Sequence, residues 1–394
     1  MISQLSNSDV IEFIQENLNR DPASVALQAD KFPNLPMREI ASQIASRQKV
    51  AKKLPEWVKN ERIIFPLKEN LEQASSQITA EFKSDLVEGE ALLDLTGGSG
   101  IDTYYLQKKF NKTVYVEPNF QLCEIAHHNF TELNADIEII QSSAEDYILT
   151  SDRKYDLVYI DPSRRSEAKQ KVIKMEDYSP NVFTILPKLC MITDRILIKV
   201  SPMMDIKQAL NELWKVEKII CLSVANEMKE VLIEINLKTN KTVTLQTVNI
   251  NHGIKQEFSA TFEEERLAQY EVKAPQKYIY EPNTAIRKAG LFKLISERFQ
   301  ISKLQSNTHL YTSNYCLSDF PGKCFECIEI IKTDKKSIRK AAPKGIINVI
   351  TKNYPLGANA IKKKYQLKDG GEKYLIFCNT QDLGNVCLHC SLIK

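Results

Sequence analysis

The chain has 394 residues, 43% of them hydrophobic and 26% charged, so it is long enough for two or three domains with packed cores. No stretch approaches the roughly eighteen uncharged apolar residues of a membrane span, and the N-terminus lacks the basic and apolar segments of a signal peptide. The nine cysteines are odd in number and scattered in apolar contexts, which indicates free thiols and a cytoplasmic location.

The net charge of +3 is unevenly distributed. Residues 323–373 hold 13 basic and 5 acidic residues, a local net charge of +8. Such asymmetry predicts an anionic partner for the C-terminal part of the chain. The simpler alternative is a solvated, lysine-rich surface.

Residues 1–85 predict an N-terminal helical domain, because their apolar residues follow the helical period and no strand pattern occurs. Ser8 or Asp9 can cap a first helix, and Pro36 suits the first turn of a second one.

Two features of this N-terminal region leave alternatives open. Residues 47–68 carry seven basic and two acidic residues around Trp57. This segment could contact nucleic acid, but a helix with one packed tryptophan is the favoured interpretation. Further on, Ser75 and Ser76 could either hydrogen-bond a polar ligand or cap a helix.

A glycine-rich turn follows the first predicted strand. The strand ends in Asp94, and a helix-compatible segment begins at Ile101. Glycines let the backbone turn sharply and approach a ligand closely, and a helix N-terminus exposes unpaired N–H groups. A nucleotide-like ligand usually binds at such a junction. The candidate ligand-binding residues here are Asp94, Thr96, Gly97, Gly98 and Gly100.

Residues 86–238 alternate between strand and helix patterns, which predicts an α/β domain with a mainly parallel sheet. The predicted strands are 91–95, 113–116, 137–141, 157–160, 196–200, 219–224 and 231–235. Only six residues separate the last two strands, too few for a crossover helix, so this pair should be antiparallel.

Polar residues follow the predicted parallel strands, whose carboxyl ends share one sheet edge. Glu117 ends the second strand and can accept hydrogen bonds from both hydroxyls of a ribose. Ser143, Ala144 and Glu145 follow the third strand, where they can border an adenine ring. The fourth strand leads into Asp161.

After residue 238 the pattern changes. We expect a strand at 242–249, a helix at 284–299, a strand at 324–331, a basic helix start at 335–340, a strand at 346–351, a short basic helix at 358–365, and closing strands at 374–378 and 386–392.

Residues 90–238 resemble the class I S-adenosylmethionine-dependent methyltransferases, whose seven-stranded sheet ends in such a hairpin. In their first motif Thr96 replaces the usual first glycine, while Gly98 and Gly100 match; in the third motif Ser143 stands where an aspartate is usual. The resemblance implies S-adenosylmethionine as cofactor, with Asp94 near its amino group and Glu117 at its ribose.

Asp161-Pro162 resembles the Asp-Pro-Pro-aromatic signature of enzymes that methylate exocyclic amines of nucleobases. Ser163 replaces the second proline, and Arg164-Arg165 stands where the aromatic residue would be. The carboxylate and a backbone carbonyl would accept the two amine hydrogens and orient the nitrogen toward the methyl group. The arginines could stack on a base or hold a phosphate. The alternative role for Asp161 is to cap a turn.

Nearly the whole chain resembles a bacterial family of methyltransferases that is distantly similar to trimethylguanosine synthase. The motifs that carry this resemblance are Gln73-Ala74-Ser75-Ser76 through Lys83, residues 94–100, 161–165, 278–282, 353–356 and 368–375. The resemblance implies four parts: a helical domain at 1–85, a methyltransferase domain at 86–238, a ferredoxin-like segment at 239–322 and a THUMP-like basic domain at 323–394. THUMP domains in other proteins bind RNA, so RNA is the implied partner.

Two C-x-x-C pairs, Cys324 with Cys327 and Cys387 with Cys390, form a zinc-like inventory. The pairs lie about sixty residues apart, and in strands the positions i and i+3 point to opposite faces. Buried free thiols are therefore favoured over a metal site.

The sequence thus predicts an S-adenosylmethionine-dependent methyltransferase that acts on a nucleobase of RNA, with an exocyclic amine favoured. The alternatives are a methyltransferase acting on a small molecule or protein, and a non-catalytic RNA-binding protein with a vestigial methyltransferase fold. The target nucleoside and the oligomeric state are not predicted.

Overall fold

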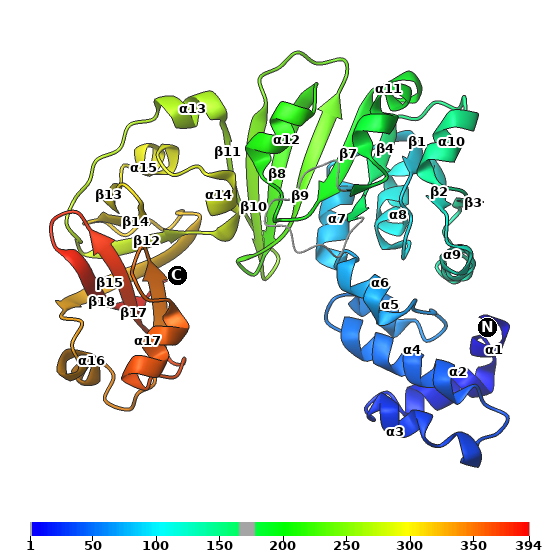
Figure 1. The fold of residues 1–394 in the computed structure, drawn as a ribbon, viewed down its shortest axis with the longest axis horizontal. Coiled ribbons are helices and arrows are strands. Elements are labelled where there is room, and N and C mark those ends of the chain that lie inside the picture. Colours follow the sequence, from blue (N-terminus) through cyan, green and yellow to red (C-terminus); the bar gives the residue numbers. More distant parts are fainter. Residues whose placement is uncertain (1, 165–177, 394) are drawn as a thin grey trace. The chain divides into compact units, whose positions relative to one another are not determined.

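The computed structural model describes residues 2–164 and 178–393 (Figure 1). The chain forms two compact units. Unit 1 comprises Met1–Lys218 and Lys229–Lys241, and unit 2 comprises Ile219–Met228 and Thr242–Lys394. In the part of the chain that the structure describes, no helix combines the length and apolar character needed to cross a membrane.

Unit 1 begins with a run of helices, as predicted. They are α1 (Ile2–Leu5), α2 (Ser8–Glu16), α3 (Pro22–Ala26), η1 (Ala29–Lys31), α4 (Met37–Val50), α5 (Pro55–Lys59), α6 (Lys68–Gln73) and α7 (Gln77–Asp85).

The starts of two of these helices differ from expectation. Asn7, rather than Ser8 or Asp9, caps α2, because its side chain accepts a hydrogen bond from the Asp9 backbone N–H. Pro36 occupies the N-cap of α4 instead of its first turn. Trp57 is packed in the interior of this helical region, in a cluster with Val50, Leu54 and other apolar residues.

A nine-stranded sheet follows the helices. Seven of its strands come in the order β8-β9-β7-β4-β1-β2-β3, and the hairpin of β10 (Thr244–Asn251) and β11 (Ile254–Thr261) adds two more strands next to β8. The strands are β1 (Gly89–Asp94), β2 (Phe110–Glu117), β3 (Glu138–Gln141), β4 (Leu157–Ile160), β7 (Arg195–Val200), β8 (Val216–Val224) and β9 (Glu227–Asn236). Strands β3, β2, β1, β4 and β7 are parallel, and β9 pairs antiparallel with β7. The apolar strand residues, such as Leu92, Val158 and Ile198, are fully buried, as expected for a sheet covered on both faces.

The remaining elements of unit 1 follow strands of this sheet (Figure 1). They are α8 (Ile101–Leu106), η2 (Gln107–Lys109), α9 (Phe120–Glu132), α10 (Ala144–Thr150), α11 (Val182–Ile192), α12 (Ile206–Glu212) and the short antiparallel pair β5 (Ser163–Arg164) and β6 (Tyr178–Ser179). Side-chain caps start several helices directly after strands: Asn119 caps α9, Ser143 caps α10 and Asp205 caps α12. Each of the seven predicted strands is present, so the predicted α/β class is confirmed.

Unit 2 contains the tip of the β8–β9 hairpin, the hairpin of β10 (Thr244–Asn251) and β11 (Ile254–Thr261), and a seven-stranded sheet of order β13-β14-β12-β15-β18-β17-β16. Its other strands are β12 (Tyr278–Pro282), β13 (Ser302–Gln305), β14 (Thr308–Ser313), β15 (Gly322–Ile331), β16 (Asn348–Lys352), β17 (Lys373–Thr380) and β18 (Gly384–Leu392). Its helices are α13 (Phe262–Leu267), α14 (Thr284–Ala289), α15 (Leu294–Phe299), α16 (Lys335–Ala341) and α17 (Ala358–Tyr365).

The single helix predicted over 284–299 is wrong, because the chain forms two helices there. Gly290 has a left-handed backbone conformation with φ of 74° and ends α14. Apolar residues continue at helical spacing across this break, so the sequence pattern could not reveal it. The predictions for the later strands and for α16 and α17 agree with the observed elements.

Candidate active site

The glycine turn after β1 is built around the Asp94 carboxylate. One oxygen, Oδ1, accepts a hydrogen bond from the Thr96 N–H at 2.9 Å, and the other, Oδ2, accepts one from the Thr103 hydroxyl at 2.6 Å. Asp94 is almost completely buried, and burial raises its pKa to about 7 despite these two hydrogen bonds. Asp94 can therefore change its charge near neutral pH.

Glycine is required at two positions of this turn. A Cβ atom on Gly97 would lie 2.1 Å from the Tyr115 ring, and Gly100 has φ of 76° and closes the turn before α8. A Cβ on Gly100 would also lie 2.8 Å from Phe130. Both glycines thus let the loop pack closely on β2 and α9.

Glu117, at the end of β2, is fixed in place by backbone groups. Its Oε2 accepts a hydrogen bond from Gly98 N and its Oε1 accepts one from Asn119 N, each at 2.9 Å. Carboxylate oxygens have further lone pairs, so Glu117 can accept additional hydrogen bonds from a ligand without releasing these two.

These residues border one cleft of about 860 Å³ in unit 1, within the range of small-molecule sites. The predicted site residues that line it are Asp94, Thr96, Gly97, Gly98, Glu117, Ser143, Ala144, Glu145, Asp161 and Pro162. Gly100 does not line the cleft and serves the turn instead. Arg164 belongs to β5, and its backbone pairs with that of Tyr178 in the neighbouring strand β6; its side chain is not described. Arg165 lies outside the described residues.

Asp161 follows β4 and is held from two sides. Its backbone N–H donates to the Thr96 hydroxyl at 2.6 Å, and its Oδ2 accepts a hydrogen bond from Lys199 Nζ at 2.5 Å. Among the described residues, Oδ1 of Asp161 has no hydrogen-bond partner, and the side chain is one-third exposed at the cleft. This oxygen is thus available to a ligand.

Behind Asp161 lies a buried group of charged side chains. Lys83 on α7 contacts Glu230 Oε1 at 2.6 Å, Asp102 Oδ1 at 3.2 Å and the Ser75 hydroxyl at 2.9 Å. Lys83 has no exposed surface. An unpaired buried charge is costly, and the two carboxylates and the hydroxyl around Lys83 offset that cost.

The second lysine of the group, Lys199 on β7, connects it to the cleft. Besides Asp161, its Nζ contacts Ser75 Oγ at 3.3 Å and Asp102 Oδ2 at 3.5 Å, and the Tyr159 hydroxyl donates to Asp102 Oδ2 at 2.7 Å. Burial alone would raise the pKa of Asp102, but the two lysines outweigh it and lower that pKa. We name Ser75, Lys83, Asp102, Tyr159, Asp161, Lys199 and Glu230 the buried charge cluster.

Sequence reasoning missed most of this cluster. The available signal was a charged residue within an otherwise apolar, buried strand, as at Lys199 and Glu230. Of the two serines, Ser76 caps α7, which confirms the helix-cap alternative for it, while Ser75 hydrogen-bonds Asp102 and lines the cleft, where a ligand contact stays a prediction.

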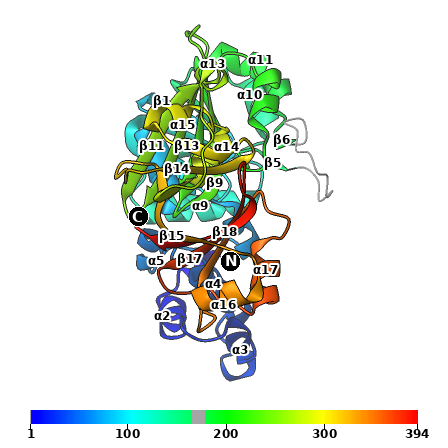
Figure 2. The same cartoon turned by 90° about the vertical axis from the view of Figure 1, so that its left-hand side faces the viewer.

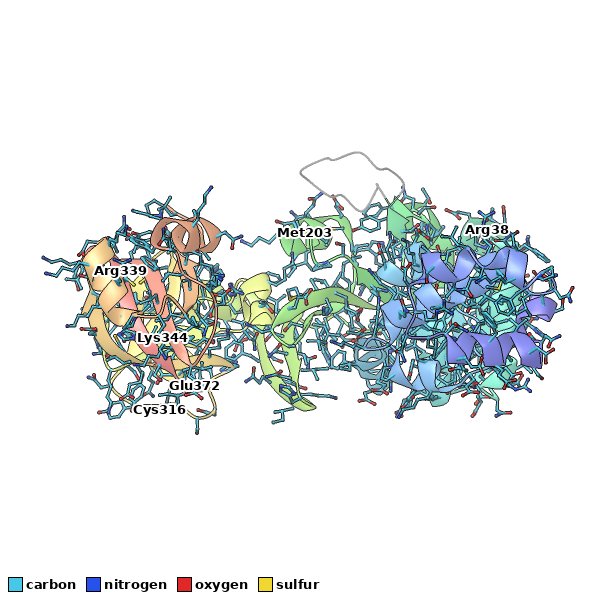
Figure 3. All side chains as sticks on the ribbon, turned by 90° about the horizontal axis from the view of Figure 1, so that it is seen from below. Arg38, Met203, Cys316, Arg339, Lys344 and Glu372 are labelled. Carbon is cyan, nitrogen blue, oxygen red and sulfur yellow. The ribbon has the colours of Figure 1, made fainter. Side chains whose placement is uncertain are left out.

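Unit 2 carries a basic surface on its last two helices. Helices α16 and α17 lie side by side, and their apolar residues pack against β16, β17 and β18 (Figure 2). Their exposed basic residues, with those of the adjoining loops, are Lys335, Lys336, Arg339, Lys340, Lys344, Lys363, Lys364, Lys368 and Lys373 (Arg339 and Lys344 are labelled in Figure 3).

Most cysteines of unit 2 occupy strands, and Cys316 lies in the loop between β14 and β15. Cys327 and Cys390 are opposite each other in the β15–β18 pair, and the Cys316 and Cys324 sulfurs are 4.0 Å apart. Within the described ranges, no three or more His, Cys, Asp or Glu side chains are grouped as a metal site would need.

The order of the strands β3 to β8 and the cleft at the ends of β1 to β4 define the class I methyltransferase fold, a fold whose enzymes use S-adenosylmethionine as methyl donor. The chain is similar over 98% of its length, with 30% identity and a TM-score of 0.89, to a "putative methyltransferase" from Porphyromonas gingivalis, of which it covers 98%. The chain therefore belongs to the same family as that protein.

Further comparisons concern parts of the chain. Residues 278–321 match a ferredoxin-like domain model and residues 322–392 a THUMP domain-like model. TrmK from M. capricolum, in complex with S-adenosyl-homocysteine, is 16% identical over 42% of this chain and 70% of its own, with a TM-score of 0.33. A "putative methyltransferase" from Streptococcus mutans, also in complex with S-adenosyl-homocysteine, is 15% identical over 41% of this chain and 96% of its own, with a TM-score of 0.31. No curated protein matches the sequence.

Proposed function

We propose that the protein is an S-adenosylmethionine-dependent methyltransferase that methylates a nucleobase of RNA, at an exocyclic amine. The observation that carries this proposal is that one cleft is bordered both by the residues predicted to bind the cofactor and by the residue predicted to position the acceptor. Asp94, Glu117 and Ser143 come from the first three strand ends, and Asp161 comes from the fourth.

The residues of the cleft fit this cofactor. Glu117 offers acceptor oxygens on a rigid support, which suits the two hydroxyls of a ribose. Asp94 supplies negative charge beside the turn, which suits an ammonium group, and Gly98, where a Cβ would meet only the Thr96 carbonyl, leaves room for close approach to the backbone. When bound, the cofactor supplies a methyl group on a positively charged sulfur.

Asp161 is the residue that would position the acceptor. Its free Oδ1 would accept one N–H of an amine, and a neighbouring backbone carbonyl would accept the other, which directs the nitrogen lone pair at the methyl group. In the transfer a C–N bond would form, the C–S bond would break to leave the neutral thioether, and the acceptor nitrogen would release a proton to water in the cleft. Held in this geometry, the reaction gains mainly from orientation.

RNA is supported as the substrate class by the basic surface of unit 2 and its match to a THUMP-like model. Phosphate contacts from lysine and arginine supply affinity without reading sequence. The nucleobase would then be selected in the cleft of unit 1.

The test combines binding and modification with the full-length protein. Calorimetry with S-adenosylmethionine should give measurable binding that is lost in Glu117→Ala. Total RNA from a strain lacking the protein is incubated with the protein and S-adenosylmethionine. It should gain one methylated nucleoside, identified by mass spectrometry, and the Asp161→Asn variant should not produce this nucleoside. Absence of cofactor binding would refute an enzyme, and cofactor binding with modification of protein or small molecules alone would refute RNA as the substrate.

A further inference from the structure

Lys199 makes three polar contacts, and each is to the protein itself. Its ammonium group has three N–H donors, and its contacts are Asp161 Oδ2, Ser75 Oγ and Asp102 Oδ2. The residue is only 8% exposed although it lines the cleft. No donor is left over for a substrate, so the direct role of Lys199 concerns Asp161.

We infer that Lys199 is a positioning residue for the methyl acceptor: its contact at 2.5 Å fixes one oxygen of Asp161, so that the other oxygen is presented to the cleft as a hydrogen-bond acceptor. This inference rests on the proposed function, in which Asp161 contacts the acceptor. An ammonium group beside the carboxyl favours its ionised form, which accepts hydrogen bonds and cannot donate one, so the methyl acceptor must present an N–H or O–H donor.

The surroundings of Asp161 explain why a cation is needed there. Asp94 and Asp102 bring further negative charge close to it, and burial raises the pKa of Asp161. A neutral carboxyl group would carry a proton and could donate a hydrogen bond. It would therefore also bind substrates that present a carbonyl oxygen or a ring nitrogen at this place. Lys199 acts against this protonation.

The titratable groups that face this pair come from five elements and from the segment between α4 and α5. They are Lys53 in that segment, Lys83 on α7, Asp94 on β1, Asp102 on α8, Tyr159 on β4 and Glu230 on β9. The carboxylates outweigh burial and raise the pKa of Lys199, so the lysine stays protonated over the working pH range. It therefore cannot serve as the base that removes the acceptor proton.

The test is a double-mutant cycle of Lys199→Met and Asp161→Asn in the full-length protein. Lys199→Gln, which keeps donors without the charge, replaces Lys199→Met if that variant does not fold. Lys207→Met, a change of an exposed lysine on α12, is the matched control. Melting temperature from pH 5 to pH 8, cofactor affinity and methylation rate are measured for each variant.

We expect Lys199→Met to bind S-adenosylmethionine within about threefold of the parent, whereas its methylation rate falls about 100-fold, as for other losses of orientation. Its rate should recover with rising pH, since Asp161 must now lose a proton from a higher pKa. Its melting-temperature deficit should shrink as pH falls, because a buried carboxyl with raised pKa stabilises the fold in its protonated form.

In the Asp161→Asn background, Lys199→Met should have little further effect on rate, and the pH-dependent part of the melting-temperature deficit should vanish. Additive effects, or a pH-dependent deficit that persists in this background, would overturn the inference and assign Lys199 to Asp102. The melting temperatures need no cofactor, so they judge the Lys199–Asp161 pair even if the protein fails to bind S-adenosylmethionine and the proposed function falls.

Discussion

Replacing Lys83 with methionine should strongly destabilise unit 1. Lys83 is fully buried and contacts two carboxylates, Glu230 at 2.6 Å and Asp102 at 3.2 Å. Removing one partner of a buried pair typically costs about 3–5 kcal/mol, because the other charge stays buried without compensation. For a unit of this size, that corresponds to a fall in melting temperature on the order of 10 °C.

The effect of Lys83→Met should depend on pH with a definite sign. Without the lysine, burial raises the folded-state pKa of Glu230 further above the unfolded-state value of about 4, whereas Asp102 keeps its contact with Lys199. A group with such a raised pKa contributes stability below about pH 4 and loses it as pH rises through the raised pKa. The difference in unfolding free energy between variant and parent should thus be largest near pH 8 and smallest near pH 5.

Thermal and denaturant unfolding followed by circular dichroism provide the assay, and a second lysine on the helical segment provides the control. Lys49 contacts Glu72 at 3.0 Å, but both side chains are about half exposed. Lys49→Met should therefore cost less than about 1 kcal/mol. The double variant Lys83→Met with Glu230→Gln should recover part of the loss, because it removes one unpaired charge. A Lys83→Met protein as stable as the Lys49→Met protein, at every pH, would refute the reasoning.

Four further outcomes follow from the cleft and the basic surface. Gly97→Ala should destabilise the protein by about 1–3 kcal/mol, since the added methyl group strikes a buried ring, and denaturant melts that match the parent would contradict this packing. Glu117→Ala should weaken S-adenosylmethionine binding about 100-fold in calorimetry, the worth of a hydrogen bond to a charged group, and an unchanged affinity would remove the ribose role. Cofactor affinity should rise as pH increases through about 7, where the buried Asp94 becomes charged, and a flat profile between pH 6 and pH 8 would place the cofactor's ammonium group elsewhere. On the basic surface, Lys363→Glu with Lys364→Glu should weaken RNA binding and reduce its salt dependence by about 0.7 for each lost phosphate contact, whereas an unaltered salt slope would mean that α17 faces solvent.

The sheet could be predicted from sequence because most of its strands are short runs of consecutive apolar residues, as expected where both faces of a sheet are covered. Helical patterns and turn residues separate these runs. The residues at its strand ends followed from the same alternation, since parallel strands place their carboxyl ends at one edge. Local contacts, such as those that cap a helix, were harder to predict from the sequence. Whether Asn7, Ser8 or Asp9 caps α2 depends on backbone angles that a polar triplet does not reveal.

The buried charge cluster could not be predicted, because its members are far apart in the chain. Lys83 and Glu230 are separated by 147 positions, and Lys199 and Ser75 by 124. Sequence periodicity reports which face of an element is apolar, but it does not report which charged residues of different elements meet. In a strand such as Arg195–Val200, a lysine among apolar residues signals a buried partner without naming it.

Thr96 gives a physical reason for the departure of this chain from the usual glycine motif. Its hydroxyl accepts the hydrogen bond from Asp161 N at 2.6 Å, and its backbone N–H donates to Asp94 at 2.9 Å. A glycine could make the second contact but not the first. Thr96 therefore ties the end of β1, where the cofactor is proposed to bind, to the end of β4, where the acceptor is proposed to bind. Since Lys199 holds the side chain of Asp161 and Thr96 holds its backbone, both contacts fix the same residue relative to the glycine turn. Orientation of acceptor against donor is the main requirement of methyl transfer, and in the proposed function a hydroxyl at the backbone and an ammonium group at the side chain of Asp161 would supply it.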